Sequence, residues 1–136
     1  MNERVVVVNA SKMNYDHLLD FSVVSNDVQV YDDSTNAELI ERIQGAAVVV
    51  TKEIPVGAEL LSQFPESVKL IVEAGTGYNN IDLDVARAKG ITVCNIPAYS
   101  TERVAHTAIM MLLNFASTMQ QQIGMLARGD RSNFTK

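Results

Sequence analysis

The chain has 136 residues, 47% of them hydrophobic and 20% charged, which is ordinary for one globular domain with a core of its own. Its net charge is −5 and it has no basic run, so we expect no nucleic-acid partner. The longest apolar stretch, residues 109–113, is far shorter than the roughly 20 residues that span a bilayer, and no secretory signal is visible. We therefore expect a cytoplasmic protein with no membrane partner.

Five short apolar runs predict β-strands. The first is a continuous β-branched run, which is typical of a central parallel strand covered on both faces. The fifth contains Cys94, the one cysteine, for which we expect a buried and inert thiol. The predicted strands cover residues 4–9, 28–31, 46–51, 68–74 and 91–95.

Helices are predicted between the strands. Ser34 or Thr35 can cap a helix over residues 36–44, which Gly45 ends. Shorter helices are expected at 58–63 and 81–90, and a short helix or turn at 14–20. This alternation predicts an α/β fold with a parallel sheet, helices on both faces and the flavodoxin-like strand order 2-1-3-4-5. We assign residues 1–100 to this domain.

A long helix is predicted from Thr101 to Ala127, with Ser100 as its N-cap and residues 101–136 forming a second part of the chain. Between Val104 and Phe115 the helix is apolar on nearly every face. A helix of this kind is buried on all sides, and one small sheet cannot bury it. We therefore expect it to contact another domain or another chain.

The segment from Glu73 to Asp82 carries most of the functional information. Gly75 and Gly77 follow a predicted strand, so bare N–H groups reach the edge of the sheet where open α/β folds bind ligands. Such a loop can hold a carboxylate or a phosphate without a basic side chain. Two alternatives remain: a tight turn that requires small residues, and a dinucleotide fingerprint, for which Asn80 stands where a third glycine belongs.

Other candidate residues carry less chemistry. His17 lies in a polar turn, and His106 lies on the long helix, where Glu102 one turn earlier indicates helix support. The histidines and the cysteine have no metal-ligand spacing. A phosphorylated receiver domain is excluded because Asn9 and Thr51 stand at strand ends where acids should hold Mg²⁺.

Three blocks of sequence together resemble the NAD-dependent D-2-hydroxyacid dehydrogenases. They are Glu73–Asp82, Ala86–Val93 and Asn95–Ala105, and the third is closest to the glycerate dehydrogenase (hydroxypyruvate reductase) branch. The resemblance implies a flavodoxin-like substrate domain followed by a helix that crosses to an NAD-binding domain. It also implies a homodimer built around the helix over residues 101–127.

The resemblance assigns roles to particular residues. The backbone amides of Thr76 and Gly77 would hold the substrate carboxylate, and Thr51 and Lys52 would border the substrate pocket. Thr76 and Val104 would lie near the nicotinamide end of the cofactor, NAD. Tyr78-Asn79-Asn80 departs from the family's aromatic-Asp-Asn, which we expect to alter a structural hydrogen bond.

The resemblance places the cofactor fingerprint and the catalytic arginine, glutamate and histidine beyond Lys136. The sequence therefore predicts the substrate-domain part of an oxidoreductase that transfers hydride between NAD(H) and a small 2-hydroxy or 2-oxo acid, inactive by itself. The alternative is a non-catalytic module that dimerises through the long helix. The acid, and the choice of NAD or NADP, are left open.

Overall fold

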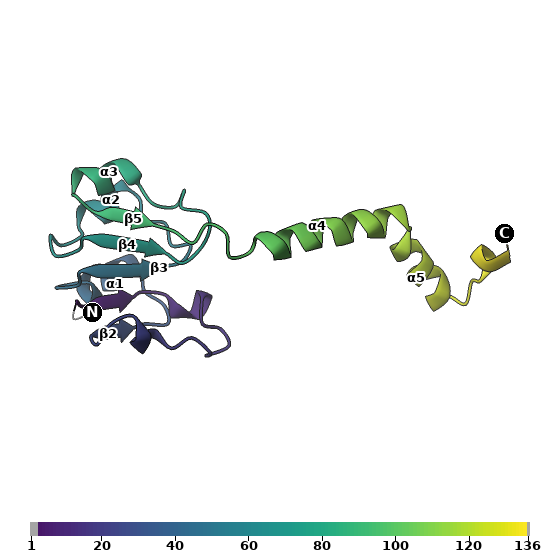
Figure 1. Cartoon of the computed structure of the whole chain (residues 1–136), viewed down its shortest axis with the longest axis horizontal. Helices are drawn as coiled ribbons and strands as arrows, with labels where there is room; N and C mark the ends of the chain where they lie inside the picture. The colour runs from purple at the N-terminus through teal and green to yellow at the C-terminus, as the bar shows by residue number, and fades with distance from the viewer. Residues whose placement is uncertain (1–2, 136) are drawn as a thin grey trace. The chain divides into compact units, whose positions relative to one another are not determined.

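The computed structural model describes residues 3–135 and divides into two compact units, residues 1–97 and 98–136. The first unit contains five parallel strands in the order β2-β1-β3-β4-β5 (Figure 1), which confirms the predicted order. Each strand is three or four residues long, shorter than the apolar run that predicted it. The strands are β1 (Val5–Val7), β2 (Val28–Val30), β3 (Val48–Thr51), β4 (Leu70–Glu73) and β5 (Thr92–Cys94).

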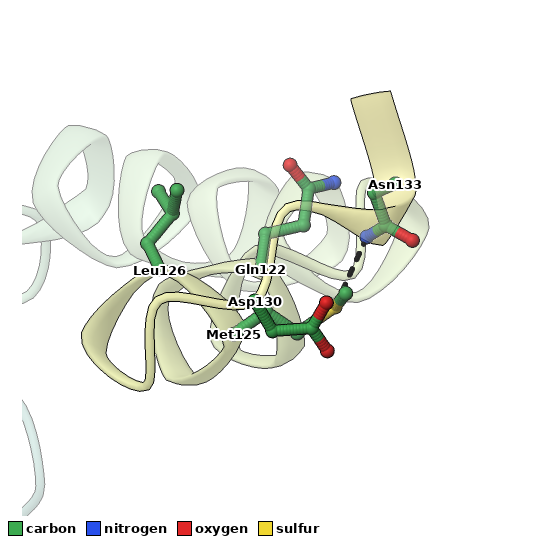
Figure 2. Close-up of a pocket in the computed structure, with 5 residues that line it drawn as sticks. All are labelled: Gln122, Met125, Leu126, Asp130 and Asn133. Carbon is green, nitrogen blue, oxygen red and sulfur yellow. Dashed lines mark hydrogen bonds between the residues drawn. The ribbon is translucent and has the colours of Figure 1, made fainter. Parts of the chain in front are cut away.

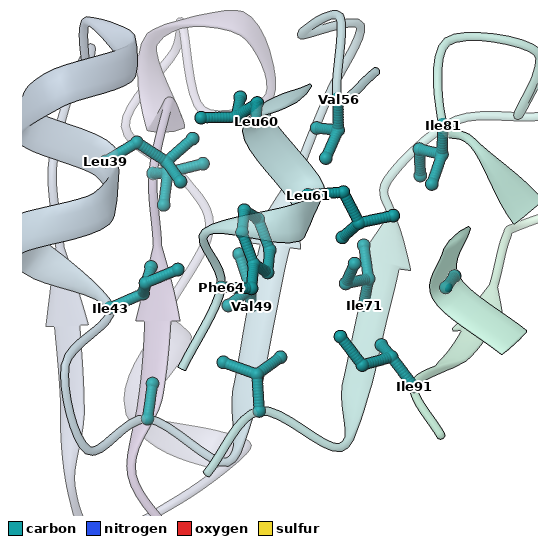
Figure 3. Close-up of a cluster of buried hydrophobic side chains, with 14 of the residues drawn as sticks. Leu39, Ile43, Val49, Val56, Leu60, Leu61, Phe64, Ile71, Ile81 and Ile91 are labelled. Atoms are coloured by element: carbon teal, nitrogen blue, oxygen red, sulfur yellow. The ribbon is translucent and has the colours of Figure 1, made fainter. Parts of the chain in front are cut away.

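The register of the strands places one apolar face of the sheet against three helices. Val6, Val49 and Ile71 are register neighbours on this face, and all are almost completely buried. The helices are α1 (Asn36–Arg42), α2 (Ala58–Ser62) and α3 (Leu83–Ala88), and each contributes buried side chains to the same cluster (Figure 3). The alternation of core and non-core residues along each strand follows from its two-residue period.

The opposite face of the sheet is less evenly covered. A right-handed crossover from β1 to β2 must run over this face, and it carries two 3-10 turns, η1 (Ala10–Lys12) and η2 (Phe21–Val23). Val5 and Val7 are buried there, whereas Cys94 at the far edge is exposed. The expectation of a buried Cys94 is therefore wrong, because its side chain lies on the less covered face of an edge strand.

The predicted cap of α1 is confirmed at Thr35. The hydroxyl of Thr35 accepts a hydrogen bond from the Glu38 N–H, and the Glu38 carboxylate accepts one from the Thr35 N–H at 2.9 Å. Glu38 also forms an ion pair with Arg42, one turn later. This reciprocal pair satisfies donors that the first turn of a helix leaves free.

The second unit contains two helices, α4 (Thr101–Ala116) and α5 (Met119–Ala127), and the 3-10 turn η3 (Ser132–Thr135). The single helix predicted over 101–127 is thus divided, because Thr118 adopts a left-handed conformation with φ of 51°. Ser100 occupies the predicted N-cap position, but its side chain makes no capping hydrogen bond. Within residues 3–135, no helix is both long and apolar enough to cross a membrane.

No residue of α4 is buried within the chain, and the apolar positions predicted to need a partner are open to solvent. Phe115, for example, is 84% exposed. This apolar surface of α4 is formed by Val104, Ile109, Met110, Met111, Leu112, Leu113 and Phe115.

The capping box makes the stability of the first unit depend on pH through Glu38. Hydrogen bonds from the backbone and hydroxyl of Thr35, together with the Arg42 charge, hold the pKa of Glu38 below its ordinary value of 4.5. A lowered folded-state pKa stabilises the fold above 4.5, and this stabilisation is lost as pH falls through the folded-state value. At pH 7 we expect Glu38→Ala to lower the urea midpoint more than Glu41→Ala, on the same helix.

The measurement is urea unfolding followed by circular dichroism at several pH values. The difference between Glu38→Ala and Glu41→Ala should shrink as the pH falls below 4.5. A difference that stays constant down to acid pH would show that the ionised Glu38 carboxylate does not stabilise α1.

Candidate functional site

The bend after β4, residues 75–80, presents backbone N–H groups at the carboxyl edge of the sheet. Thr76 and Gly77 are both exposed. Their N–H groups donate no hydrogen bond to any residue between 3 and 135. Adjacent unengaged amides can donate together to a carboxylate or a phosphate oxygen. The bend thus has unengaged donors, and the binding of an anion by them stays a prediction.

The carbonyl side of the bend is fixed to the segment after β5. The Ile96 N–H donates to the Gly75 carbonyl at 2.9 Å, and the Asn95 side-chain amide donates to the Thr76 carbonyl at 2.7 Å. The Thr76 hydroxyl donates to the Ile96 carbonyl at 3.2 Å. These contacts engage the acceptors of the bend and leave its N–H groups available.

Three polar side chains are buried beneath this edge: Asn9, Thr51 and Glu73. Asn9 holds the backbone of Lys52 with both ends of its amide, accepting from the Lys52 N–H at 3.0 Å and donating to the Lys52 carbonyl. These two hydrogen bonds give partners to the backbone N–H and carbonyl of Lys52, which lies just after β3. Asn9 therefore fixes where the chain leaves β3.

The predicted pocket residues Lys52 and Thr51 occupy different environments. Lys52 is half-buried, and its ammonium group lies 3.3 Å from the Ala74 carbonyl, directly before the bend. Lys52 thus places a positive charge near the start of the bend. Thr51 is 1% exposed, and its hydroxyl has no hydrogen-bond partner among the described residues. Its contact with a substrate stays a prediction.

Gly75 is buried, unlike Thr76 and Gly77. A Cβ atom at Gly75 would lie 3.1 Å from a carboxylate oxygen of Glu73, a contact tighter than real Cβ atoms usually make. This glycine therefore leaves room for a neighbouring carboxylate. The tight-turn interpretation of the motif is correct to this extent for Gly75.

The start of α3 is unsuited to the phosphates of a dinucleotide. Asp82 is its N-cap, and the Asp82 carboxylate accepts from the Val85 N–H at 3.0 Å, while Asp84 adds a second acid in the first turn. Two carboxylates at a helix N-terminus oppose a phosphate that would bind there. The fingerprint interpretation of Gly75-x-Gly77-x-x-Asn80 is thus disfavoured by geometry as well as by sequence.

The other candidate residues are not part of the bend. Val104 and His106 are exposed on α4, in the second unit, and the nicotinamide contact expected of Val104 stays a prediction. His17 is exposed in its turn, as predicted. No group of three or more potential metal ligands exists among residues 3–135.

Each unit has a cavity. One of about 580 Å³ lies between α1 and α2, beside Ile40 and Leu60. A second, of about 270 Å³, lies against α5 (Figure 2), where the Asn133 amide contacts the Met125 sulfur at 3.2 Å. Neither cavity is lined by Thr76 or Gly77.

Sequence reasoning did not assign roles to Asn9, Glu73, Asn80 and Asn95. In the sequence, Asn9 and Asn80 stand out only as asparagines where other motifs carry an acid or a glycine. Asn9, Glu73 and Asn95 directly follow apolar runs, and a polar residue in that position is the signal that could have found them. Such a residue must find hydrogen-bond partners at the edge of the sheet. Asn80 lies within the bend and carries no such signal.

Residues 4–128 match the family model for the D-isomer specific 2-hydroxyacid dehydrogenase catalytic domain. The chain therefore belongs to the D-2-hydroxyacid dehydrogenase family, as its motifs indicated.

Among curated relatives, the chain is 33% identical over 96 residues to glycerate dehydrogenase from Methylorubrum extorquens, covering 71% of this chain and 30% of the relative. It is 40% identical over 76 residues to hydroxypyruvate reductase from Blautia hydrogenotrophica, covering 56% of this chain and 23% of that protein. The chain thus spans less than a third of the length of these relatives.

Among solved structures, it resembles D-lactate dehydrogenase from Aquifex aeolicus, determined with NAD and lactic acid. The TM-score is 0.79 at 23% identity, over 95% of this chain and 38% of that one, which is a likeness of fold. A 3-phosphoglycerate dehydrogenase from Entamoeba histolytica with bound NAD⁺ gives a TM-score of 0.69 at 25% identity, over 84% of this chain and 39% of that one.

Proposed function

We propose that this chain forms the substrate domain of an NAD-dependent oxidoreductase that interconverts small D-2-hydroxy acids and 2-oxo acids. The observation that carries the proposal is the pair of unengaged amides at Thr76 and Gly77, in a chain matched by the family model over residues 4–128. The relatives named glycerate dehydrogenase and hydroxypyruvate reductase favour a substrate about the size of glycerate or hydroxypyruvate.

The bend supplies binding and orientation. The N–H groups of Thr76 and Gly77 would each donate to one carboxylate of the substrate, and the ammonium of Lys52 would add attraction from one side. Thr51 would border the same pocket. Fixing the carboxylate fixes the direction in which the neighbouring 2-carbon faces the cofactor.

When bound, NADH would supply the hydride for reduction of the 2-oxo acid, and NAD⁺ would accept it in the reverse direction. The residues of this chain that would adjoin its nicotinamide end are Thr76 and Val104, and the acids at the start of α3 argue against its phosphates binding there. The dinucleotide would therefore be held mainly by another part of the enzyme. The groups that polarise and protonate the substrate would not belong to the bend, as the resemblance to the family implies.

A second candidate function follows from the apolar surface of α4. A soluble monomer rarely exposes so many contiguous apolar side chains, so this helix could join two copies of the chain into a non-catalytic module. A coding sequence that continues past Lys136 into a glycine-rich fingerprint would favour the enzyme. A stop codon after Lys136 would favour the module.

The binding proposal is tested by adding D-glycerate to ¹⁵N-labelled chain and following backbone amides by NMR. We expect the largest shifts at Thr76 and Gly77, saturating in the millimolar range because only part of the site is present. Glycerol, which lacks the carboxylate, is the matched control and should leave both amides unmoved. Shifts of equal size with glycerol, or none with D-glycerate, would contradict the role of the bend.

We expect the purified 136-residue chain to show no turnover, because none of its residues is assigned the transfer of a proton to the 2-oxo oxygen. The measurement is the loss of NADH absorbance in the presence of hydroxypyruvate or pyruvate. NADH oxidation that rises in proportion to the concentration of the chain would refute the assignment of catalysis to other residues.

Association through α4 is tested by sedimentation of the wild-type chain and two variants at micromolar concentration. Leu112→Glu places a charge on the apolar surface of α4 and should shift the chain toward monomer. Gln121→Glu adds the same charge on α5 and should leave the distribution unchanged. A wild-type chain that sediments as a stable monomer would argue against both the dimer and the module.

A further inference from the structure

Glu73 is an acid at a position where the sequence pattern calls for an apolar side chain. It is the last residue of β4, on the same face as Ile71, and it is completely buried. A carboxylate removed from water costs several kcal/mol unless it is well hydrogen-bonded. Its hydrogen bonds therefore indicate what it contributes.

Each oxygen of Glu73 accepts a hydrogen bond from a different loop. One accepts from the backbone N–H of Glu53 at 3.0 Å, in the loop after β3. The other accepts from the side-chain amide of Asn80 at 2.9 Å, at the far end of the bend. The same Asn80 nitrogen donates to the Ile54 carbonyl at 2.8 Å. One carboxylate thus joins both ends of the bend to the preceding loop.

One of these contacts is made by a residue in an unfavourable backbone conformation. Glu53 has a φ of 58°, in the left-handed region that residues with a side chain seldom occupy. Its N–H donates the hydrogen bond that the Glu73 carboxylate accepts. The missing side chain at Gly75 provides the space for the carboxylate. The loop after β3 and the bend after β4 are therefore one hydrogen-bonded assembly.

We propose that Glu73 is a positioning residue: it fixes the bend so that the amides of Thr76 and Gly77 meet a substrate carboxylate in one geometry. It does not touch the substrate itself. This inference rests on the proposed function, and it deepens that function by naming what pre-organises the bend.

The variant Glu73→Gln tests the proposal because charge and positioning predict opposite results. Glutamine has the same size but one acceptor oxygen, so its NH₂ group must face either the Glu53 N–H or the Asn80 amide. If Glu73 acted only as a nearby negative charge, its removal would tighten the binding of an anion. As a positioning residue, its replacement weakens D-glycerate binding by about fivefold or more, the equivalent of one lost hydrogen bond.

Amide hydrogen exchange separates positioning from general destabilisation. In Glu73→Gln the Glu53 amide should exchange faster, whereas the adjacent Lys52 amide, which Asn9 holds, should keep its rate. General unfolding would accelerate both amides. Glu66→Gln removes an equal charge from an exposed position and should leave D-glycerate affinity and both exchange rates unchanged.

The outcomes are distinct. If the Thr76 and Gly77 amides of the wild-type chain show no NMR shift with D-glycerate, the proposed function is overturned and this inference with it. Wild-type binding together with equal or tighter binding by Glu73→Gln overturns this inference alone. If that variant does not fold, Asn80→Ala is titrated with D-glycerate in its place, because it removes one donor and keeps the buried carboxylate. Weaker binding by Asn80→Ala supports the inference, and equal or tighter binding overturns it. A Glu53 amide that exchanges as fast as free loop amides in the wild-type chain overturns the inference without any variant.

Discussion

The carboxylate of Glu73 joins two loops that the sheet only brings close together. Parallel strands deliver their carboxyl ends to one edge, which is why the loops after β3 and β4 are neighbours. Proximity alone does not fix the conformation of one loop relative to the other. Here Glu53 donates to one oxygen and Asn80 to the other, so the buried acid is satisfied only when both loops take the observed conformation. The cost of burying a charge thereby becomes a constraint on the bend at Thr76 and Gly77.

The rest of the first unit supports this edge. Three helices cover the face of the sheet that carries Val49 and Ile71, and the well-covered core fixes the lengths and ends of β3 and β4. The other face is covered near β1 and open toward β5, where Cys94 is exposed. The second unit presents a long apolar helix surface that this chain leaves uncovered. Under the proposed function, both exposed surfaces would contact other polypeptide.

The sequence predicted the strand order and most of the elements because their signals are local. These signals are the spacing of the apolar residues and the capping and turn residues at the ends of each element. A hydroxyl residue, Ser34 or Thr35, predicts the start of α1, and Gly45 predicts its end. Cys94 was mispredicted because an apolar strand does not reveal whether both its faces are covered. The break at Thr118 was missed because threonine carries no strong signal for a left-handed residue. In the site, the glycines predicted a bend with free amides, whereas the partners of Glu73 come from loops 7 and 20 residues away, and no local pattern shows such contacts.

Membership of the D-2-hydroxyacid dehydrogenase family and the free amides of the bend point to one central claim: main-chain N–H groups bind the carboxylate of a small acid. The most direct measurement is a crystal structure of the chain soaked with D-glycerate. The account predicts carboxylate oxygens about 2.8–3.0 Å from the nitrogens of Thr76 and Gly77. A carboxylate bound elsewhere, with these two nitrogens bonded to other protein atoms, would contradict it.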